Sequence, residues 1–430
     1  MLKTPIARGV ALATLGATLA IPTMAQAAFI EDTKAGLELR NFYYNSDNRQ
    51  DGASQSKQDE WAQGFLLRVE SGYTEGTVGF GVDALGLLGV KLDSSPDRTG
   101  TGLLPAGDSG RAPDDYSELG LTAKAKVSKS VLKVGTLQLK NPAIATSDSR
   151  LLPAVMSGGQ LVSNEIDGLT LDLGYIDQIN NRNSTNYEDM VVNGGETRNS
   201  SGNIVSGSKG ITGTFGENSD ELVYLGGTYK VTKDLSASYY YSNLEDFYKQ
   251  HALNLIHVLP IADGQSLKTD LRYQRSKDDG NSNVDNKALG AMVTYSISGH
   301  SFGLGYQKMS GDTGFAYVGG NIDPYLVNYV QIGDFANKDE KSWQARYDFN
   351  FAAVGIPGLS FMTRYISGDD FGANGDRKEW ERDTDIGYTF QEGALKNLNL
   401  KWRNATFRSN GTGSDIDQNR LIVSYTIPLM

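Results

Sequence analysis

Apolar and polar residues alternate one for one in short segments that recur along most of this chain. In "WQARYDFNF", Trp343, Ala345 and Tyr347 fall on one face, opposite Gln344 and Arg346. A period of two is typical of β-strands that present one apolar and one polar face. The same alternation is found in "LELRNFYYN" (37–45), "SELGLTAKAKV" (117–127), "LKTDLRY" (267–273), "LNLKWRN" (398–404) and "RLIVSYTIPLM" (420–430). The sequence therefore predicts an all-β protein.

The connections between these segments distinguish two kinds of β protein. Short turns such as "VSKS" (127–130) and "SGHS" (298–301) alternate with long polar loops rich in Gly, Asn and Asp, as in transmembrane barrels. A soluble β-sandwich would also alternate, but these apolar faces carry too few large aliphatic residues to fill its core, and the mean hydropathy is −0.38. We expect an antiparallel transmembrane β-barrel. Aromatic residues near the predicted strand ends fit the girdles of such barrels: Tyr43, Trp61, Tyr239, Tyr241 and Trp343.

The number of predicted strands is about eighteen, an even number as single-chain barrels require. Eighteen strands close around a lumen wide enough for water and small solutes. Their predicted first residues are 34, 60, 74, 116, 131, 160, 169, 221, 235, 247, 265, 287, 301, 341, 359, 381, 396 and 417.

The first 27 residues have the features of a secretory signal peptide. Lys3 and Arg8 precede an apolar stretch, and Ala25-Gln26-Ala27 forms a small-residue cleavage pattern. Residues 28–430 are then one outer-membrane barrel domain. The chain has no Cys, which excludes disulfides, Cys-ligated metals and thiol catalysis.

Charge placement suggests what the lumen does. The chain has a formal charge of −11, yet the polar strand faces repeatedly carry cations. The apolar face must meet lipid, since an Arg at the bilayer midplane costs about 2–4 kcal/mol in a barrel. The cations should therefore point into the lumen and favour anions, although they could simply form salt bridges with lumen acids. Acidic residues are expected mainly in loops, including 368–383. The lumen-facing cations are Arg40, Arg68, Lys124, Lys126, Lys268, Arg272, Arg346, Arg364, Lys401, Arg403 and Arg420.

One segment breaks the alternation. "NPAIATSDSRLLPAVMSGGQLVSNEI" (141–166) has no period and carries a single cation, Arg150, next to Asp148 and Ser149. A loop of small residues held by Pro142 and Pro153 can fold into the lumen and bring Arg150 to a constriction; the alternative is a loop that caps the outside. A second long loop, 311–340, could fold in opposite it and place Asp323 across from Arg150.

The chain offers little for catalysis or cofactors. His251, His257 and His300 could suggest a barrel hydrolase, but no carboxylate or third His accompanies the pair on one face, as a metal site would need. "GTGS" (411–414) has no helix after it and is not a phosphate-binding loop. We expect no enzyme activity, no metal, no cofactor and no nucleic-acid partner.

Several stretches resemble the OprD family of outer-membrane channels, also called the Occ family of carboxylate channels. They cover the whole mature chain: "FIEDTKAGLELRNFYYNSDNRQ", "NPAIATSDSRLLP", "SNEIDGLTLDLGY", "NIDPYLVNYVQIGDFANKDEKSWQARYDFNFAAVGIPGLSFMTRYISGDD" and "NRLIVSYTIPL". The resemblance implies eighteen strands, inward-folded third and seventh loops, and a ladder of basic residues that leads to an eyelet. By motif it assigns the ladder to Arg49, Arg150, Arg182 and Arg420, and the eyelet acid to Asp323. Strand parity adds Arg364, Lys401 and Arg403.

Two departures from the family pattern stand out. The polar stretch 193–220, expected to be a flexible extracellular loop, is longer than is usual in the family, and the chain ends in Met430 rather than an aromatic residue. The loop "NPAIATSDSRLLP" resembles the branch that takes aromatic and cyclic carboxylates. The resemblance thus implies passive uptake of small carboxylates, benzoate-like acids first, by a monomer or weak homo-oligomer among outer-membrane lipid and lipopolysaccharide. The alternative is selection of basic amino acids or peptides; a barrel hydrolase using His251 or His257 is a third reading.

Overall fold

The computed structural model describes residues 29–50, 53, 55–107, 110–198, 203–205, 207, 209–411 and 415–430. The predicted signal peptide, residues 1–27, lies outside the described residues. Within the described part, no helix is long and apolar enough to cross a membrane.

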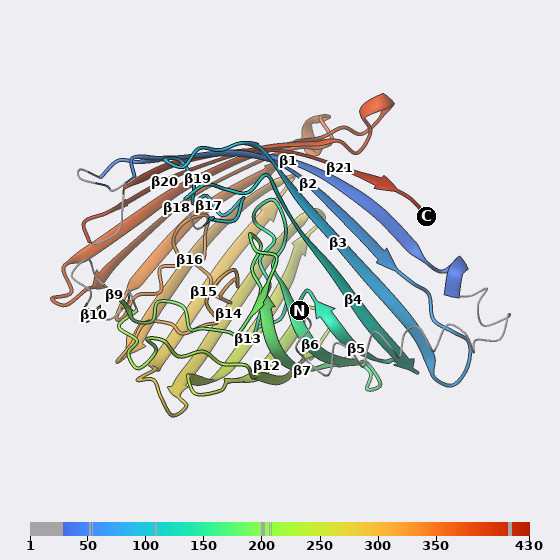
Figure 1. Cartoon of the computed structure of the whole chain (residues 1–430), viewed down its shortest axis with the longest axis horizontal. Coiled ribbons are helices and arrows are strands. Elements are labelled where there is room, and N and C mark those ends of the chain that lie inside the picture. Colours follow the sequence, from blue (N-terminus) through green and yellow to red (C-terminus); the bar gives the residue numbers. More distant parts are fainter. Residues whose placement is uncertain are drawn as a thin grey trace.

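Eighteen long strands of the described chain form one closed antiparallel wall, as predicted. Each pairs with its neighbours in sequence order, and β1 (Lys34–Asn48) pairs with β21 (Ile416–Pro428) to close the barrel. Figure 1 shows the tilted strands following one another around the wall, with the blue β1 beside the red β21. The other wall strands are β2 (Lys57–Glu70), β3 (Gly79–Asp93), β4 (Asp115–Val127), β5 (Ser130–Leu137), β6 (Val155–Ser163), β7 (Leu169–Asn180), β11 (Leu222–Lys230), β12 (Leu235–Leu244), β13 (Tyr248–Ala262), β14 (Gln265–Asp278), β15 (Asp285–Ile297), β16 (His300–Gly311), β17 (Lys341–Asn350), β18 (Leu359–Phe371), β19 (Arg377–Thr389) and β20 (Asn399–Ser409).

The remaining elements are short. β8 (Tyr187–Glu188) extends the sheet beside β7, and β9 (Thr197–Arg198) pairs with β10 (Ile204–Val205) in the same long connection. Two 3₁₀ turns, η1 (Phe351–Val354) and η2 (Gly393–Leu395), lie in connections at the opposite end of the barrel.

The two faces of the wall agree with the predicted alternation. On β14, Leu271 is 43% exposed toward the outside, whereas Asp270 is 6% exposed and lies inside. Leu304 on β16 is 69% exposed, as an outward residue surrounded by lipid would be in the isolated protein. The apolar stripe therefore faces outward and the charged positions face the lumen.

The predicted strand starts agree with the structure to within about five residues, and the two informative errors have physical causes. β6 begins at Val155, not 160, because its "SGGQ" stretch hides the alternation. Gly158 occupies φ +153° at a register shift opposite β7, where a Cβ would lie 2.1 Å from the Tyr175 carbonyl oxygen. β19 begins at Arg377, so much of the acidic run 368–383 is wall strand rather than loop.

The acids of β19 correct the expectation that such residues face solvent in loops. Glu381 and Asp383 are fully buried in the lumen wall. Glu381 accepts hydrogen bonds from the backbone N–H groups of Ile332 (2.9 Å) and Gly333 (2.7 Å). Both carboxylates have partners in the interior, since Glu381 anchors an inward-folded loop and Asp383 pairs with Arg364 of β18 at 2.7 Å.

Four long connections at one end of the barrel, termed the lumen loops, have described residues that pack inside it. They are residues 94–114, 138–154, 181–221 and 312–340. Leu103 and Leu151 are fully buried against wall residues Tyr44 and Leu66, and Ile144 and Ile322 join a second apolar cluster. Burial of apolar side chains thus holds the loops inside, since each fully buried aliphatic side chain contributes about 1.5–3 kcal/mol. Described parts of the stretch 193–220, expected to be flexible and extracellular, belong to this packed set.

Candidate functional site: a charged constriction in the lumen

The loop of residues 138–154 folds inward and pairs with the loop of residues 312–340. Thr146 and Ile322 form an antiparallel bridge. The Ser147 N–H donates to the Asn321 carbonyl (3.0 Å), and the Asp323 N–H donates to the Ala145 carbonyl (2.8 Å). The two loops are thus joined edge to edge through their backbones.

The side chain of Asn141 starts the inward bend of the first loop. Its Oδ1 accepts from the N–H groups of Ala143 and Ile144, both at 3.0 Å, and its amide donates to Asp172 of β7 at 2.9 Å. An Asn that bonds the backbone two and three residues ahead stabilises such a turn. The sequence "NPAI" therefore encodes both the bend and its attachment to the wall.

The guanidinium of Arg150 lies over the ring of Tyr44, 5.1 Å from its centroid. Its Nε donates to the Thr101 carbonyl (3.1 Å), and one terminal nitrogen donates to the Ser149 carbonyl (3.1 Å). Thr101 belongs to the loop of residues 94–114, which Glu60 of β2 holds through the Ser94 hydroxyl (2.7 Å) and the Thr101 hydroxyl. Arg150 is therefore oriented by the loop of residues 94–114, whose contribution no pattern in the sequence indicates.

Arg420 contacts the same tyrosine. It lies 5.4 Å from the Tyr44 centroid, and the two residues are register partners across the closing pair β1–β21. Its Nε donates to Gln418 (2.7 Å), and a terminal nitrogen donates to the Gln331 carbonyl (3.2 Å). Arginine stacks well on aromatic rings because its guanidinium is planar and weakly hydrated. One ring thus supports two cations.

Arg182 joins this group through Ser149. One of its terminal nitrogens donates to the Ser149 hydroxyl at 3.1 Å, and the same hydroxyl lies 3.4 Å from Arg150. The Nε of Arg182 is buried without a hydrogen-bond partner among the described residues. The Ser149 hydroxyl thus accepts from two guanidinium groups.

Asp323 and Arg182 line the same cavity. The Asp323 carboxylate accepts from the Tyr329 hydroxyl at 2.8 Å. Asp323, Tyr329 and Arg182 line one cavity of about 370 Å³, together with Lys209 and Asp334. The group combines donors for an anion with a carboxylate that repels it.

Asp148 has a structural partner. Its carboxylate pairs with Arg40 of β1 at 2.6 Å, and Arg40 also donates to the carbonyls of Arg150 (2.9 Å) and Leu151 (3.3 Å). Arg40 therefore ties the loop of residues 138–154 to the wall, and we find Asp148 engaged in that attachment.

The other predicted ladder residues are each paired with an acid and lie at different depths of the lumen. Arg403 is level with Arg420, its register partner across β20 and β21. Arg49 follows β1 at the long-loop end and pairs with Asp417 at 2.9 Å. Arg364 pairs with Asp383 at 2.7 Å, and Arg403 and Lys401 reach Asp385 at 3.0 and 3.7 Å. These pairs support the salt-bridge alternative for each cation taken singly.

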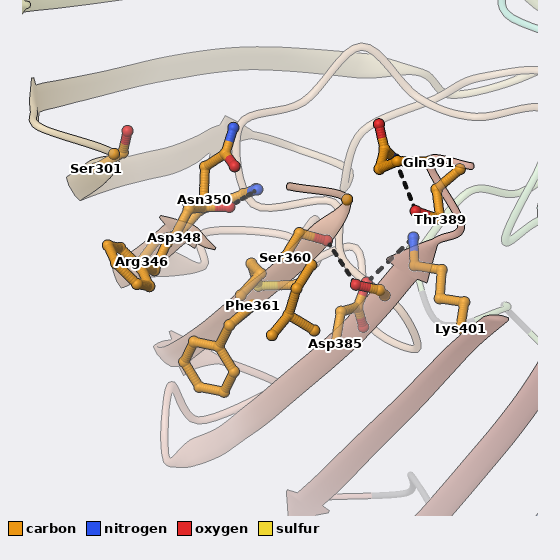
Figure 2. Close-up of a pocket in the computed structure, with 16 residues that line it drawn as sticks. Ser301, Arg346, Asp348, Asn350, Ser360, Phe361, Asp385, Thr389, Gln391 and Lys401 are labelled. Atoms are coloured by element: carbon orange, nitrogen blue, oxygen red, sulfur yellow. Dashed lines mark hydrogen bonds and ion pairs between the residues drawn. The ribbon is translucent and has the colours of Figure 1, made fainter. Parts of the chain in front are cut away.

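A second cavity lies at the short-turn end of the lumen. It has a volume of about 690 Å³ and is lined by residues of β16 to β20 and their turns. Figure 2 shows the ion pair between Lys401 and Asp385, while Arg346 and Asp348 line another part of the cavity. Arg346 pairs with Asp348 at 2.7 Å. Cations thus also line the lumen at its short-turn end.

The histidines lie apart from these groups. His251 and His257 are on the outward side of β13, where His251 contacts the Tyr239 hydroxyl at 2.8 Å. His300 contacts the Tyr347 hydroxyl at 2.8 Å and stacks on Phe349. No cluster of three or more potential ligands of the His, Asp and Glu types occurs in the described residues. The positions of these histidines beside aromatic residues suit the aromatic girdle of a barrel.

Sequence reasoning missed Tyr44, Tyr329 and Thr101. Alternation puts Tyr44 on the same face as Arg40, but its role depends on the closing contact with Arg420, its partner at the other end of the chain. Tyr329 lies in an aperiodic loop, where parity gives no orientation. Only the "NIDPYLVNY" motif marks that region.

Comparison with known proteins agrees with this architecture. Residues 27–429 match the family model described as outer membrane porin, OprD family. Porin D of Pseudomonas aeruginosa is 38% identical over 94% of this chain and 92% of its own. Among solved structures, Pseudomonas aeruginosa OpdQ is 60% identical with a TM-score of 0.85, covering 94% of this chain and 100% of its own. Pseudomonas aeruginosa OpdK, solved with vanillate, is 38% identical with a TM-score of 0.83, covering 93% and 100%.

Proposed function

Because this chain belongs to the OprD family of outer-membrane porins, we propose that it admits small carboxylates by diffusion and prefers benzoate-like aromatic acids. The observation that carries the proposal is the grouping of Arg150, Arg182 and Arg420 around Ser149 and Tyr44. A guanidinium can hold a carboxylate through two parallel hydrogen bonds, and planar groups pack well against it.

The acid beside these cations has a separate task in the proposal. A channel must release what it binds, so attraction at the narrowest point has to be offset. Asp323, which Tyr329 holds at 2.8 Å, would repel the carboxylate from the Arg182 side and speed its release. The cations at both ends of the lumen would deliver and remove the anion, and no bond chemistry is involved.

The aromatic preference draws on two supports. The "NPAIATSDSRLLP" loop resembles the aromatic-acid branch, and OpdK, whose structure contains vanillate, shares the fold at a TM-score of 0.83. In the membrane we expect a monomer or weak homo-oligomer in contact with lipid and lipopolysaccharide.

A second candidate function is selection of basic amino acids or peptides. The observation in its favour is that the cavity beside the constriction is lined by three carboxyl groups, of Asp323, Asp334 and Glu379, and by two cations. A cationic solute would meet these acids before the arginines.

Uptake into proteoliposomes separates the candidates. The panel contains benzoate, vanillate, succinate and lysine, tested with the parent protein and Arg150→Ala. We expect benzoate and vanillate to enter fastest and to lose that advantage in the variant. Lysine entering faster than every carboxylate would favour the second candidate.

A further inference from the structure

The long connection of residues 181–221 is attached to the loop of residues 312–340 by backbone hydrogen bonds. The Asn193 N–H donates to the Tyr317 carbonyl (2.8 Å), and the Gly319 N–H donates to the Val191 carbonyl (2.6 Å). Farther along, the Gly314 N–H donates to the Lys209 carbonyl (2.7 Å). The described residues of this connection therefore line the lumen at its long-loop end.

Lys209, a described cation of this connection, is buried and pairs with an acid of the loop of residues 312–340. Lys209 is 2% exposed, and its Nζ lies 2.6 Å from Oδ2 of Asp334. The Tyr317 hydroxyl donates to the same carboxylate oxygen at 3.0 Å. The aliphatic stem fits between two glycines, since a Cβ on Gly194 would lie 2.1 Å from Lys209 Cγ and one on Gly314 would lie 3.0 Å from Cδ. Both glycines leave room for this side chain.

The charge balance of the cavity depends on this lysine. Lys209 and Arg182 are the cations in its lining, against the carboxyl groups of Asp323, Asp334 and Glu379. If Lys209 were neutral, Asp334 would lose its ion-pair partner and one cation would face three carboxyl groups. Such a lining would favour cations directly before the constriction.

We infer that Lys209 is a specificity-determining residue of the channel: it neutralises Asp334 and so keeps the outer cavity open to carboxylates. The inference rests on the proposed function, and it concerns the cavity beside the constriction rather than the Arg150 group. It gives the long 181–221 connection a role in selectivity as well as in packing.

The test measures the anion-to-cation permeability ratio from reversal potentials across a bilayer in a potassium benzoate gradient. Lys209→Met should lower the ratio about fivefold, the effect of one uncompensated charge some 4 Å away in water. Lys209→Arg should keep the parent value, and Asp334→Asn should raise it. The double variant Lys209→Met/Asp334→Asn should return close to the parent.

The matched control is Lys249→Met. Lys249 also pairs with an aspartate, Asp279, but it lies on the outer end of β13 and is about half exposed. Its removal should leave the ratio unchanged. The inference that Lys209 neutralises Asp334 is wrong if Lys209→Met leaves the permeability ratio unchanged. It is also wrong if the double variant lowers the ratio as much as Lys209→Met does. A parent channel that prefers potassium would instead refute the proposed function, while the order of the variants would still test Lys209.

Discussion

At the scale of single residues, the constriction depends on a tyrosine that carries no charge. Both Arg150 and Arg420 contact the Tyr44 ring, at 5.1 and 5.4 Å from its centroid. Its hydroxyl also accepts a hydrogen bond from Gln418. The ring therefore fixes the position of two guanidinium groups that would otherwise move on long side chains and repel each other.

Two substitutions of Tyr44 should separate the contribution of its ring from that of its hydroxyl group. Tyr44→Leu removes two cation–π contacts of about 0.5–2 kcal/mol each, so the preference for benzoate over chloride should fall several-fold. Tyr44→Phe keeps the ring and should stay close to the parent. The measurement is the benzoate-to-chloride permeability ratio of single channels. Equal ratios in Tyr44→Leu and the parent would show that the ring does not position the cations.

At the scale of elements, the lumen loops act as one inserted layer. Backbone pairing joins residues 138–154 to 312–340, and 312–340 to 181–221, while Arg40 and Glu381 attach the layer to the wall. These attachments are polar groups in the interior whose partners are on another element. Removal of one partner should therefore loosen a loop rather than unfold the barrel.

Arg40→Met should widen the channel. The variant loses the ion pair with Asp148 and the hydrogen bonds to the Arg150 and Leu151 carbonyls. The loop of residues 138–154 should therefore detach, and conductance in potassium chloride should rise. Arg68→Met is the matched control, since Glu38 pairs with both Arg40 (2.9 Å) and Arg68 (3.7 Å). A rise of equal size in both variants would point to general loss of lumen charge instead.

A pH-dependent change is expected in the loop of residues 312–340. Burial and the neighbouring Glu379 raise the pKa of Glu340 well above its ordinary 4.5. The folded loop thus holds this proton more tightly than the unfolded loop, so its stability is full below pH about 4.5 and declines as pH rises toward the raised pKa. Glu340→Gln removes that charge and should stabilise the loop at pH 8 by about 1 kcal/mol or more, with little effect at pH 4.

Hydrogen exchange of residues 332–340 measures this difference. Glu217→Gln, at an exposed position in another lumen loop, serves as the control and should change exchange at neither pH. The Glu340 carboxylate accepts hydrogen bonds from the Asn337 N–H and from the Asn337 side-chain amide, both at 2.9 Å. Faster exchange in Glu340→Gln at pH 8 would mean that these hydrogen bonds make the charged carboxylate stabilising.

At the scale of the whole molecule, the sequence predicts the wall well and the lumen poorly. Strand faces follow from a period of two, so β14 and β17 were recognised from their own residues. Arg150 could be picked out as the single cation of an aperiodic segment. Tyr44 and Thr101 could not, because their roles come from contacts between elements far apart in the chain. Lys209 is likewise hidden in a polar stretch whose packing no local pattern indicates.

The orientation of the barrel follows from its connections and can be tested with cysteines. The chain has no Cys, so single substitutions report cleanly. Long loops are expected outside the cell and short turns in the periplasm. A membrane-impermeant maleimide on intact cells should label Glu217→Cys and not Lys233→Cys, whose side chain is 86% exposed in a short turn. Labelling of Lys233→Cys alone would show that the barrel has the opposite orientation in the membrane.

The central claim is that Arg150 acts on every carboxylate that passes, and single-channel recording with benzoate on one side tests it most directly. Arg150→Lys should keep anion attraction but lose preference among carboxylates, because an ammonium cannot form two parallel hydrogen bonds. Arg150→Ala should lose both, and Asp323→Asn should lengthen benzoate dwell times. If Arg150→Ala conducts benzoate like the parent, Arg150 does not control the constriction and the account is contradicted.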